Sequence, residues 1–366
     1  MMQKIVYFCP VDWRWIKQRP QFLAEQLQGY GEVSVIYPWR NRRKGLQKKT
    51  EASVRLHPYF VLPTFGRSVP VVENFNHIIG KKQIANRLRV EKPQILWLTM
   101  PWQIDLIPQN AGCPIVYDCM DDYAAISMQE GGRQRIQERE AELVRKASLI
   151  FVSSLHLMSL LKERYGVEHR KLCLLRNGYS AGWPKYSRHD ALPSGRLRIG
   201  YFGTIGRWFD FDAILESLSA FENVEYHLYG PTEKGVVIPR HERIAEHGVV
   251  EHDRIPEYAE ELDVLIMPFI PNEIVQSVDP VKLYEYIFLN KHILCIRYPE
   301  IERFEPFVEF YDTGETYMEQ LRRLLEERPA VKYTPQQAEA FLKENSWTKR
   351  AECAARKLEG LKMGER

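Results

Sequence analysis

The sequence predicts an α/β protein with two Rossmann-like domains, and three observations lead to this prediction. At 366 residues the chain is longer than the ~250–300 residues that one hydrophobic core usually serves. Short apolar runs alternate with segments of helical periodicity, which is typical of a parallel sheet covered by helices. The alternation is interrupted once, by a stretch rich in glycine and proline that starts at Asn177-Gly178, and then resumes. We therefore expect an N-terminal domain at 1–178, a linker at 179–196, a C-terminal domain at 197–345 and a closing helix at 346–366.

The individual elements follow from the same patterns. Apolar runs in the first domain predict strands at 5–9, 33–37, 95–98, 115–118, 149–152 and 173–175. Helical periodicity between them predicts helices at 19–28, 76–89, 133–146 and 156–165. In the second domain we expect strands at 197–202, 226–229, 264–267 and 293–296, and helices at 211–220, 257–262, 281–289, 316–327 and 336–343. The closing helix is expected at 347–361.

Composition excludes several classes of protein. The net charge of +3 implies no polyelectrolyte partner, so we expect no nucleic acid. The six cysteines are scattered without a Cys-x-x-Cys pair, which predicts reduced buried thiols and neither a zinc site nor a disulfide framework. The N-terminus runs straight into a strand, and no run approaches the ~18 apolar residues needed to span a bilayer. We therefore expect a cytoplasmic protein, with any membrane contact peripheral.

Basic residues are concentrated in the N-terminal domain. One stretch holds Arg40, Arg42, Arg43, Lys44, Lys48, Lys49 and Arg55, with Glu51 as its only acid, and Lys81, Lys82, Arg87 and Arg89 follow. These residues either form a solvated loop and helix face or attract an anionic membrane surface or acceptor.

The segment from Val278 to Tyr286 has the features of a helix that binds phosphate. Asp279 is a good N-cap, and Pro280 suits the first helical position. Lys282 and Glu285 lie three residues apart and share a face, at a helix end whose free N–H groups attract anions. A cation beside a carboxylate can hold a diphosphate and the neighbouring ribose diol, which indicates nucleotide-sugar chemistry. The alternative is a capped surface helix with a salt bridge.

A second pattern in the C-terminal domain is a strand that runs into a glycine-containing turn. Gly203 and Thr204 follow the strand, and Arg207 comes three residues later. Glycines there let backbone N–H groups approach a ligand at the carboxyl edge of the sheet. The alternative is a tight connection without a ligand.

Three aspartates end a strand of the first domain. Asp118, Asp121 and Asp122 lie where catalytic groups usually lie in α/β proteins, and adjacent carboxylates raise one pKa. Catalysis or acceptor binding by Asp121 and Asp122 competes with two alternatives, a helix cap and a pair of metal ligands. Because no histidine lies nearby in the sequence, we expect no metal site.

An aromatic-rich segment leaves the first strand. Asp12, Trp13 and Trp15, followed by Arg19, suggest a sugar-stacking or acceptor-binding surface. The alternative is packing between domains.

In their order and spacing, these motifs resemble the GT-B glycosyltransferases, in particular the retaining, metal-independent branch with a Glu-x7-Glu motif. The resemblance is carried by Asn177-Gly178, Gly200-Tyr201-Phe202-Gly203, residues 259–269 and Lys282-Leu283-Tyr284-Glu285-Tyr286. Residues 15–21, 117–123 and 206–210 are similar, more narrowly, to TuaH-type teichuronic acid biosynthesis glycosyltransferases.

The resemblance implies two domains facing a central cleft, with a closing helix that crosses back to the first domain. It implies that a UDP-sugar donor is bound without cofactor or metal by Gly203, Thr204, Arg207, Tyr258, Ser277, Asp279, Lys282, Leu283 and Glu285. Glu285 would bind the ribose, Lys282 and Arg207 the diphosphate, and Tyr258 would lie beside the base. Asp121, with Asp122 second, would face a glycan or lipid-linked acceptor in cell-surface polysaccharide synthesis.

One departure from the family pattern concerns the first glutamate of Glu-x7-Glu, which falls at Ser277. Asp279 and Glu273 are the candidate replacements. Because of this departure, two alternative functions stay open. The chain could be a non-catalytic carbohydrate- or nucleotide-binding protein, or a nucleotide-sugar epimerase with the GT-B fold. An NAD-dependent oxidoreductase is disfavoured, because no Gly-x-Gly-x-x-Gly follows the first strand.

Overall fold

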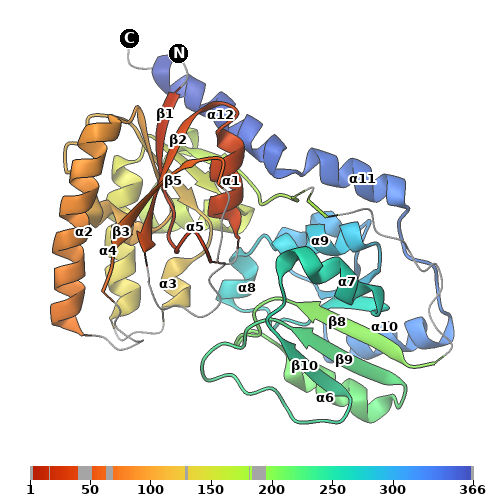
Figure 1. Ribbon diagram of the computed structural model, residues 1–366. Helices are drawn as coiled ribbons and strands as arrows, with labels where there is room; N and C mark the ends of the chain where they lie inside the picture. Colours follow the sequence, from red (N-terminus) through yellow and green to blue (C-terminus); the bar gives the residue numbers. More distant parts are fainter. Residues whose placement is uncertain are drawn as a thin grey trace. The chain divides into compact units, whose positions relative to one another are not determined.

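The computed structural model describes residues 3–15, 17–39, 52–62, 69–127, 131–180, 182–183 and 195–363. The chain forms two compact units (Figure 1). Unit 1 comprises Met1–Asn177 and Trp347–Arg366, and unit 2 comprises Gly178–Ser346. The expected linker, 179–196, lies largely outside the described residues.

Unit 1 is built on a parallel sheet. Its described strands are β1 (Gln3–Phe8), β2 (Gly31–Trp39), β3 (Arg55–Phe60), β4 (Ile95–Leu98), β5 (Ile115–Cys119), β6 (Leu149–Val152) and β7 (Leu172–Leu174). They are arranged in the order β3-β2-β1-β4-β5-β6-β7, and every pairing is parallel. Strands β4 and β6 are buried along their whole length, as strands of a sheet covered on both faces must be.

Helices cover both faces of this sheet. The described helices of unit 1 are α1 (Arg19–Leu27), α2 (Pro70–Glu91), η1 (Pro101–Leu106), α3 (Tyr123–Ile126), α4 (Gly132–Lys146), α5 (Leu155–Tyr165), η2 (His169–Lys171) and α12 (Trp347–Met363). Side chains of α2, α4 and α5 pack into one core. Side chains of α1 and α12 pack into a second core on the other face, so the C-terminal helix completes the N-terminal unit (Figure 1).

Unit 2 repeats this architecture. Its described strands are β8 (Leu197–Phe202), β9 (Val224–Tyr229), β10 (Ile244–Gly248), β11 (Val264–Met267), β12 (His292–Ile296) and β13 (Glu309–Tyr311), in the order β10-β9-β8-β11-β12-β13. All pairings are parallel. Its described helices are α6 (Phe211–Ala220), η3 (His252–Arg254), α7 (Ile255–Glu260), α8 (Glu273–Ser277), α9 (Val281–Leu289), η4 (Pro299–Phe304), α10 (Gly314–Glu326) and α11 (Pro335–Glu344).

Several elements differ from the prediction. Strands β3, β10 and β13 were not expected, because β3 and β10 are edge strands of mixed composition without a buried residue, and β13 has only three residues. Helix α9 begins one residue later than its predicted cap would require. Pro280 occupies the N-cap position, so the prediction of Asp279 as N-cap is wrong. Within the described residues, no helix is both long and apolar enough to cross a bilayer.

Candidate functional site

The strongest site feature of unit 2 is Lys282, in the first turn of α9. Its ammonium nitrogen lies 5.6 Å from the centre of the Tyr201 ring. Burial lowers the pKa of Lys282, an effect that the charge of Glu285 opposes. Among the described residues, no hydrogen-bond acceptor or carboxylate pairs with this nitrogen. Lys282 is half-buried, and a partly desolvated cation without a counter-ion favours a ligand that supplies negative charge.

Two glycines allow close packing around Lys282 at the carboxyl edge of the sheet. Gly203 follows β8 with φ +143°, and a Cβ there would lie 2.0 Å from Cε of Lys282. Gly230 follows β9, also with φ +143°, and a Cβ there would lie 2.0 Å from the Gly203 carbonyl oxygen. Neither position accepts a side chain, so the backbone and the lysine share one tight space. The exposed Thr204 continues this turn.

Glu285 lies one turn after Lys282 and is held by a histidine that the sequence reasoning missed. Nε2 of His252 lies 2.7 Å from Oε1 of Glu285. Burial disfavours protonation of His252, but the hydrogen bond and charge of Glu285 outweigh it and raise the histidine pKa. The Trp183 ring lies 4.9 Å from the His252 ring, which limits its orientation. His252 is 33 residues from Glu285 in the chain, so no local spacing could have revealed the pair.

The other oxygen of Glu285 remains available. Of its two carboxylate oxygens, only Oε1 has a partner among the described residues. Oε2 can therefore accept hydrogen bonds from a ligand hydroxyl while His252 fixes the carboxylate. This arrangement suits recognition of a diol beside a phosphate.

Asp279 and Ser277 have their side chains directed into the protein. The Asp279 carboxylate is buried and contacts the Arg303 guanidinium and the Tyr284 hydroxyl, the latter at 3.3 Å. The Ser277 hydroxyl is also buried and donates to the Ile274 carbonyl at 2.7 Å. Both side chains stabilise the segment that leads into α9, and Glu273 is exposed at the start of α8.

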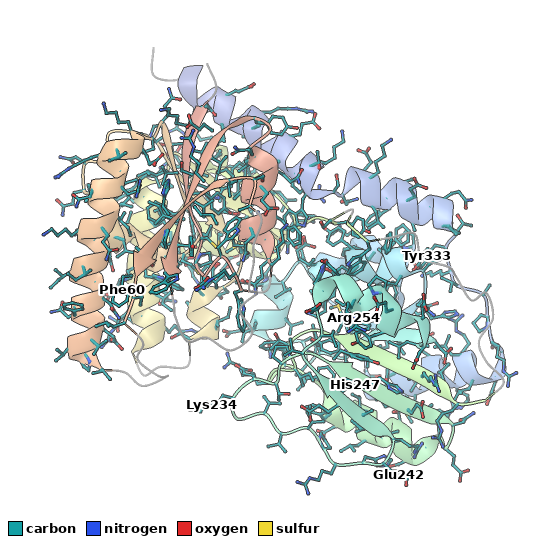
Figure 2. The ribbon with its side chains drawn as sticks, in the orientation of Figure 1. Phe60, Lys234, Glu242, His247, Arg254 and Tyr333 are labelled. Atoms are coloured by element: carbon teal, nitrogen blue, oxygen red, sulfur yellow. The ribbon has the colours of Figure 1, made fainter. Side chains whose placement is uncertain are left out.

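The remaining predicted donor residues also belong to unit 2. Tyr258 is half-buried, with the Arg254 guanidinium 5.2 Å from its ring centre, and Figure 2 shows Arg254 in unit 2. The backbone N–H of Arg207 donates to Glu233 at 3.0 Å. Leu283 is fully buried, so it could contribute only backbone groups to a ligand.

In unit 1, the end of β5 carries a buried ion pair. The Arg19 guanidinium donates to Asp118, with its shortest bond at 2.7 Å, and to the Asn177 side chain at 3.0 Å. Both charged side chains are almost completely buried. The sequence placed Asp118 in a carboxylate cluster and Arg19 in an acceptor surface, and the structure brings the two together. This pair positions the chain around Asp121.

Asp121 and Asp122 have different partners. The Asp122 carboxylate accepts two hydrogen bonds from Arg164, at 2.8 and 2.7 Å, and caps α3 through the Ala125 N–H. Burial opposes ionisation of Asp122, but the Arg164 hydrogen bonds and charge outweigh it and lower the pKa. The Asp121 carboxylate has no partner among the described residues. Burial raises the pKa of Asp121 to about 7, with Arg19 opposing and Asp122 adding to the rise.

The aromatic-rich segment before α1 is mostly structural. Asp12 is fully buried and forms an ion pair with Arg14 at 2.8 Å. Trp13 is buried in the core beneath α1 and α12. Trp15 is half-buried and is the aromatic side chain of this segment that a ligand could reach.

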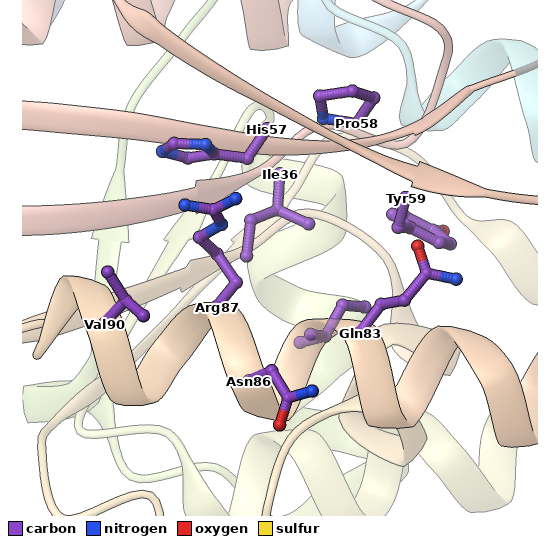
Figure 3. A pocket seen from close by; sticks show the side chains of 9 residues that line it. Ile36, His57, Pro58, Tyr59, Gln83, Asn86, Arg87 and Val90 are labelled. Atoms are coloured by element: carbon purple, nitrogen blue, oxygen red, sulfur yellow. The ribbon is translucent and has the colours of Figure 1, made fainter.

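A cavity of ≈ 320 Å³ lies between β3 and α2 (Figure 3). It is lined by Ile36, His57, Pro58, Tyr59, Gln83, Ile84, Asn86, Arg87 and Val90. None of the predicted site residues lines it. Its charged groups are matched internally, because Glu91 lies 3.0 Å from His57 and 3.8 Å from Arg87. We therefore place the candidate site at the strand ends and not in this cavity.

Most of the basic stretch lies outside the described residues, which exclude 40–51. Arg55 lies on β3 and pairs with Glu32. Lys81, Lys82, Arg87 and Arg89 all lie on α2 and are exposed. Within the described residues, no group of three His, Cys, Asp or Glu side chains could hold a metal ion.

Comparison with known proteins gives one curated relative and many structural neighbours. No family model matches the chain. The "Putative teichuronic acid biosynthesis glycosyltransferase TuaH" of Bacillus subtilis (strain 168) is 25% identical over 239 residues. That match covers 60% of this chain and 60% of TuaH, so the chain matches about three fifths of its relative's length.

Three solved structures illustrate the likeness in fold. A sucrose-phosphate synthase from Thermosynechococcus elongatus has a TM-score of 0.75 at 11% identity, covering 99% of this chain and 100% of that one. Anabaena HepE in complex with UDP and glucose has a TM-score of 0.69 at 12% identity, covering 98% and 100%. WaaG, a glycosyltransferase involved in lipopolysaccharide biosynthesis, has a TM-score of 0.64 at 15% identity, covering 96% and 98%. With its two parallel-sheet α/β units, the chain has the GT-B fold of glycosyltransferases, as the sequence predicted.

Proposed function

We propose that this protein is a glycosyltransferase that moves a sugar from a nucleoside-diphosphate sugar, with UDP as the nucleotide, to a glycan or lipid-linked acceptor. One observation carries the proposal: the half-buried Lys282, in the first turn of α9, lies against Gly203, and its ammonium has no counter-ion among the described residues. A diphosphate supplies the missing charge, and the free N–H groups at the start of α9 add to its binding.

The donor roles follow from this anchor. Lys282 and Arg207 bind the diphosphate, and Gly203 and Thr204 bring the backbone close to it. Oε2 of Glu285 accepts hydrogen bonds from the ribose hydroxyls while His252 holds Oε1. Tyr258 lies beside the base. Because the side chains of Asp279 and Ser277 are bonded within the protein, they contribute by shaping the segment before α9.

On the acceptor side we assign the reacting carboxylate to Asp121. In the transfer, the bond between the anomeric carbon and the diphosphate oxygen breaks, and a bond from the acceptor hydroxyl oxygen forms. The hydroxyl proton leaves to Asp121, whose pKa of about 7 lets it accept and release a proton near neutrality. Trp15 contributes to acceptor binding, and Arg19 positions the strand end that carries Asp121.

Similar proteins support this reaction class. TuaH is named for teichuronic acid biosynthesis, and HepE was solved in complex with UDP and in complex with both UDP and glucose. We therefore place the acceptor among the precursors of a bacterial cell-surface polysaccharide, used at the inner face of the membrane.

Two finer features belong to the proposal. Transfer is expected to be independent of metal, because Lys282, Arg207 and the start of α9 provide the positive charge for the diphosphate. EDTA should therefore leave the rate of transfer unchanged.

The resemblance to the Glu-x7-Glu enzymes implies that the transferred sugar retains its anomeric configuration. NMR spectroscopy of the sugar linkage in the product tests this expectation.

The test of the donor site is ligand-induced thermal stabilisation. UDP at 100 times its dissociation constant should add ~2.7 kcal/mol to the free energy of unfolding. Lys282→Ala should weaken UDP binding ~10–100-fold and leave uridine binding nearly unchanged, because a charge-assisted bond to phosphate contributes ~1.5–3 kcal/mol.

The matched control is Lys234→Ala, which removes an exposed lysine from the same unit (Figure 2). This variant should bind UDP like the parent. Equal losses for UDP and uridine in Lys282→Ala, or equal losses in the two variants, would refute the diphosphate assignment.

A second function is supported by Ser277. Position 277, the first of the Glu-x7-Glu pattern, holds a serine, and the Asp279 carboxylate is held by Arg303, so neither of these two positions offers a free carboxylate to the donor sugar. This observation favours a non-catalytic nucleotide-sugar-binding protein as the alternative. Release of UDP from a UDP-sugar by the purified chain, with and without acceptor, separates the two functions.

A further inference from the structure

Helix α2 exposes apolar side chains on its outer face. Val71, Phe75 and Ile78 are 80%, 47% and 56% exposed. They lie at positions i, i+4 and i+7, so they form one stripe along the first turns of the helix. Scattered apolar residues are common on surfaces, but an aligned stripe of large ones usually marks an interaction site.

The stripe lies at the carboxyl edge of the unit 1 sheet. Three contacts show that α2 runs antiparallel to β3: Glu91 to His57 at 3.0 Å, Gln83 to the Phe60 N–H at 3.1 Å, and Asn76 to the Leu62 N–H at 2.7 Å. The first turns of α2 therefore lie beside the end of β3. Because all strands of this sheet are parallel, the same edge carries the end of β5 and Asp121.

Two more exposed rings lie at this edge. Phe60 ends β3 and is 41% exposed, and Figure 2 shows it beside α2. Trp102 is 38% exposed in η1, the segment that follows β4 and contacts α2. We call these five side chains (Phe60, Val71, Phe75, Ile78 and Trp102) the α2 rim. Aromatic and aliphatic side chains in such a set suit the boundary between headgroups and acyl chains.

Basic side chains continue the stripe. Lys82 and Arg89 are exposed at i+11 and i+18 from Val71, so they lie on the same face of α2 as the apolar stripe. Glu91, by contrast, faces inward toward His57. The outer face of α2 is therefore apolar at its start and cationic at its end, which complements an anionic lipid surface. Two copies of this face would bring charges of the same sign together, which disfavours self-association.

We propose that the α2 rim, with Lys82 and Arg89, docks unit 1 on an anionic lipid bilayer. Docking at this edge would hold Asp121 at the membrane surface, where a lipid-linked acceptor presents its hydroxyl. The role of Asp121 in this inference rests on the proposed transferase function. The docking surface itself does not, because it depends only on exposure, alignment and charge.

The experiment measures co-sedimentation of the full chain with vesicles of phosphatidylcholine containing phosphatidylglycerol. Val71→Ser/Ile78→Ser should reduce the vesicle partition coefficient at least ~10-fold, because it removes buried apolar area from the docked state. Lys82→Glu/Arg89→Glu should reduce it by a similar factor in low salt and less in high salt. Val237→Ser, at an equally exposed valine of unit 2 (82%), is the matched control and should bind like the parent.

Circular dichroism melting of each variant confirms folding, and stabilisation by UDP reports the donor site separately. Docking is overturned if the parent chain does not bind anionic vesicles, or if Val71→Ser/Ile78→Ser binds like Val237→Ser. It is also overturned if the α2 variants convert a dimer to a monomer without changing vesicle binding. UDP stabilisation without vesicle binding refutes docking alone, and vesicle binding without UDP stabilisation refutes the donor assignment alone.

Discussion

Asp121 and Asp122 are neighbours in sequence, and yet their carboxyl groups have opposite surroundings. Asp122 is ionised and bonded to Arg164, whereas the Asp121 carboxylate has no partner in the described part of the chain. The ionised form of Asp121 is disfavoured by burial and by the Asp122 charge. One aspartate therefore stabilises the fold, and the other retains a proton that can be exchanged near neutrality.

Asp121→Asn should stabilise the protein at high pH and slow transfer. The folded chain retains a proton on Asp121, with a pKa of about 7, that the unfolded chain releases near pH 4. Stability of the parent chain therefore falls as pH rises from about 4 to about 7, relative to the asparagine variant. In urea unfolding at pH 8, the free energy of unfolding of Asp121→Asn should exceed that of the parent chain by about 2–4 kcal/mol. At pH 4 the two free energies should be nearly equal. Transfer should fall ~10²–10⁴-fold with UDP affinity unchanged.

Asp122→Asn is the paired control for that prediction. It weakens the bonds to Arg164 and should destabilise the chain at pH 8 by a few kcal/mol, in the range typical of broken buried ion pairs. If Asp122→Asn loses transfer without losing stability while Asp121→Asn keeps its rate, the two roles are reversed.

At the scale of elements, the candidate donor site depends on how closely the β8 turn approaches α9. Gly203 has φ +143°, and a side chain there would overlap Lys282. The turn therefore holds the lysine and a ligand-facing backbone in one place. Tyr201, whose ring faces the Lys282 ammonium, comes from the strand that ends in this turn.

Gly203→Ala should reduce UDP binding at least ~10-fold, because the new methyl group displaces Lys282, and it should also destabilise unit 2 by ~1–3 kcal/mol through backbone strain. Gly235→Ala separates these effects, since Gly235 also has positive φ but no atom within 4 Å of an added Cβ. Gly235→Ala should be destabilised while binding UDP normally in isothermal titration calorimetry. Equal loss of UDP affinity in both variants would show that strain, and not displacement of Lys282, is responsible.

At the scale of the whole molecule, the last helix belongs to the first unit. Trp347 is buried and stacks on Phe22 of α1 at 5.5 Å. Arg350 donates to the Asn177 carbonyl at 2.9 Å, and the Gln3 side chain donates to the Leu358 carbonyl at 3.3 Å. The chain therefore leaves unit 1 once and returns to complete its core, so the two units cannot fold as simple consecutive segments.

Trp347→Ala should destabilise unit 1 by ~3–5 kcal/mol, as expected for loss of a buried tryptophan. Hydrogen exchange followed by mass spectrometry should show faster exchange in β1 and α1 and unchanged protection in β11 and β12. Trp347→Phe retains an aromatic stack on Phe22 and should have a smaller effect. Uniform loss of protection in both units would show that α12 stabilises the whole chain and not unit 1 in particular.

The sequence alone was sufficient for the α/β class and for most elements, because buried parallel strands and their covering helices leave strong periodic patterns. The strands at 95–98 and 149–152 agree residue for residue with the structure. The sequence was not sufficient for the edge strands β3 and β10, whose mixed composition lacks the continuous apolar run of buried strands. Their pairing depends on hydrogen bonds to strands already in the sheet.

For the candidate site, local sequence was enough to select Lys282 and Glu285, because their spacing and the helix start lie within one segment. Only the tertiary structure paired Glu285 with His252, Asp122 with Arg164 and Asp279 with Arg303. These partners are 33, 42 and 24 residues apart in the chain. A charged residue can be chosen from sequence by its type and position, but whether it is free for a ligand depends on which distant side chain the fold brings to it.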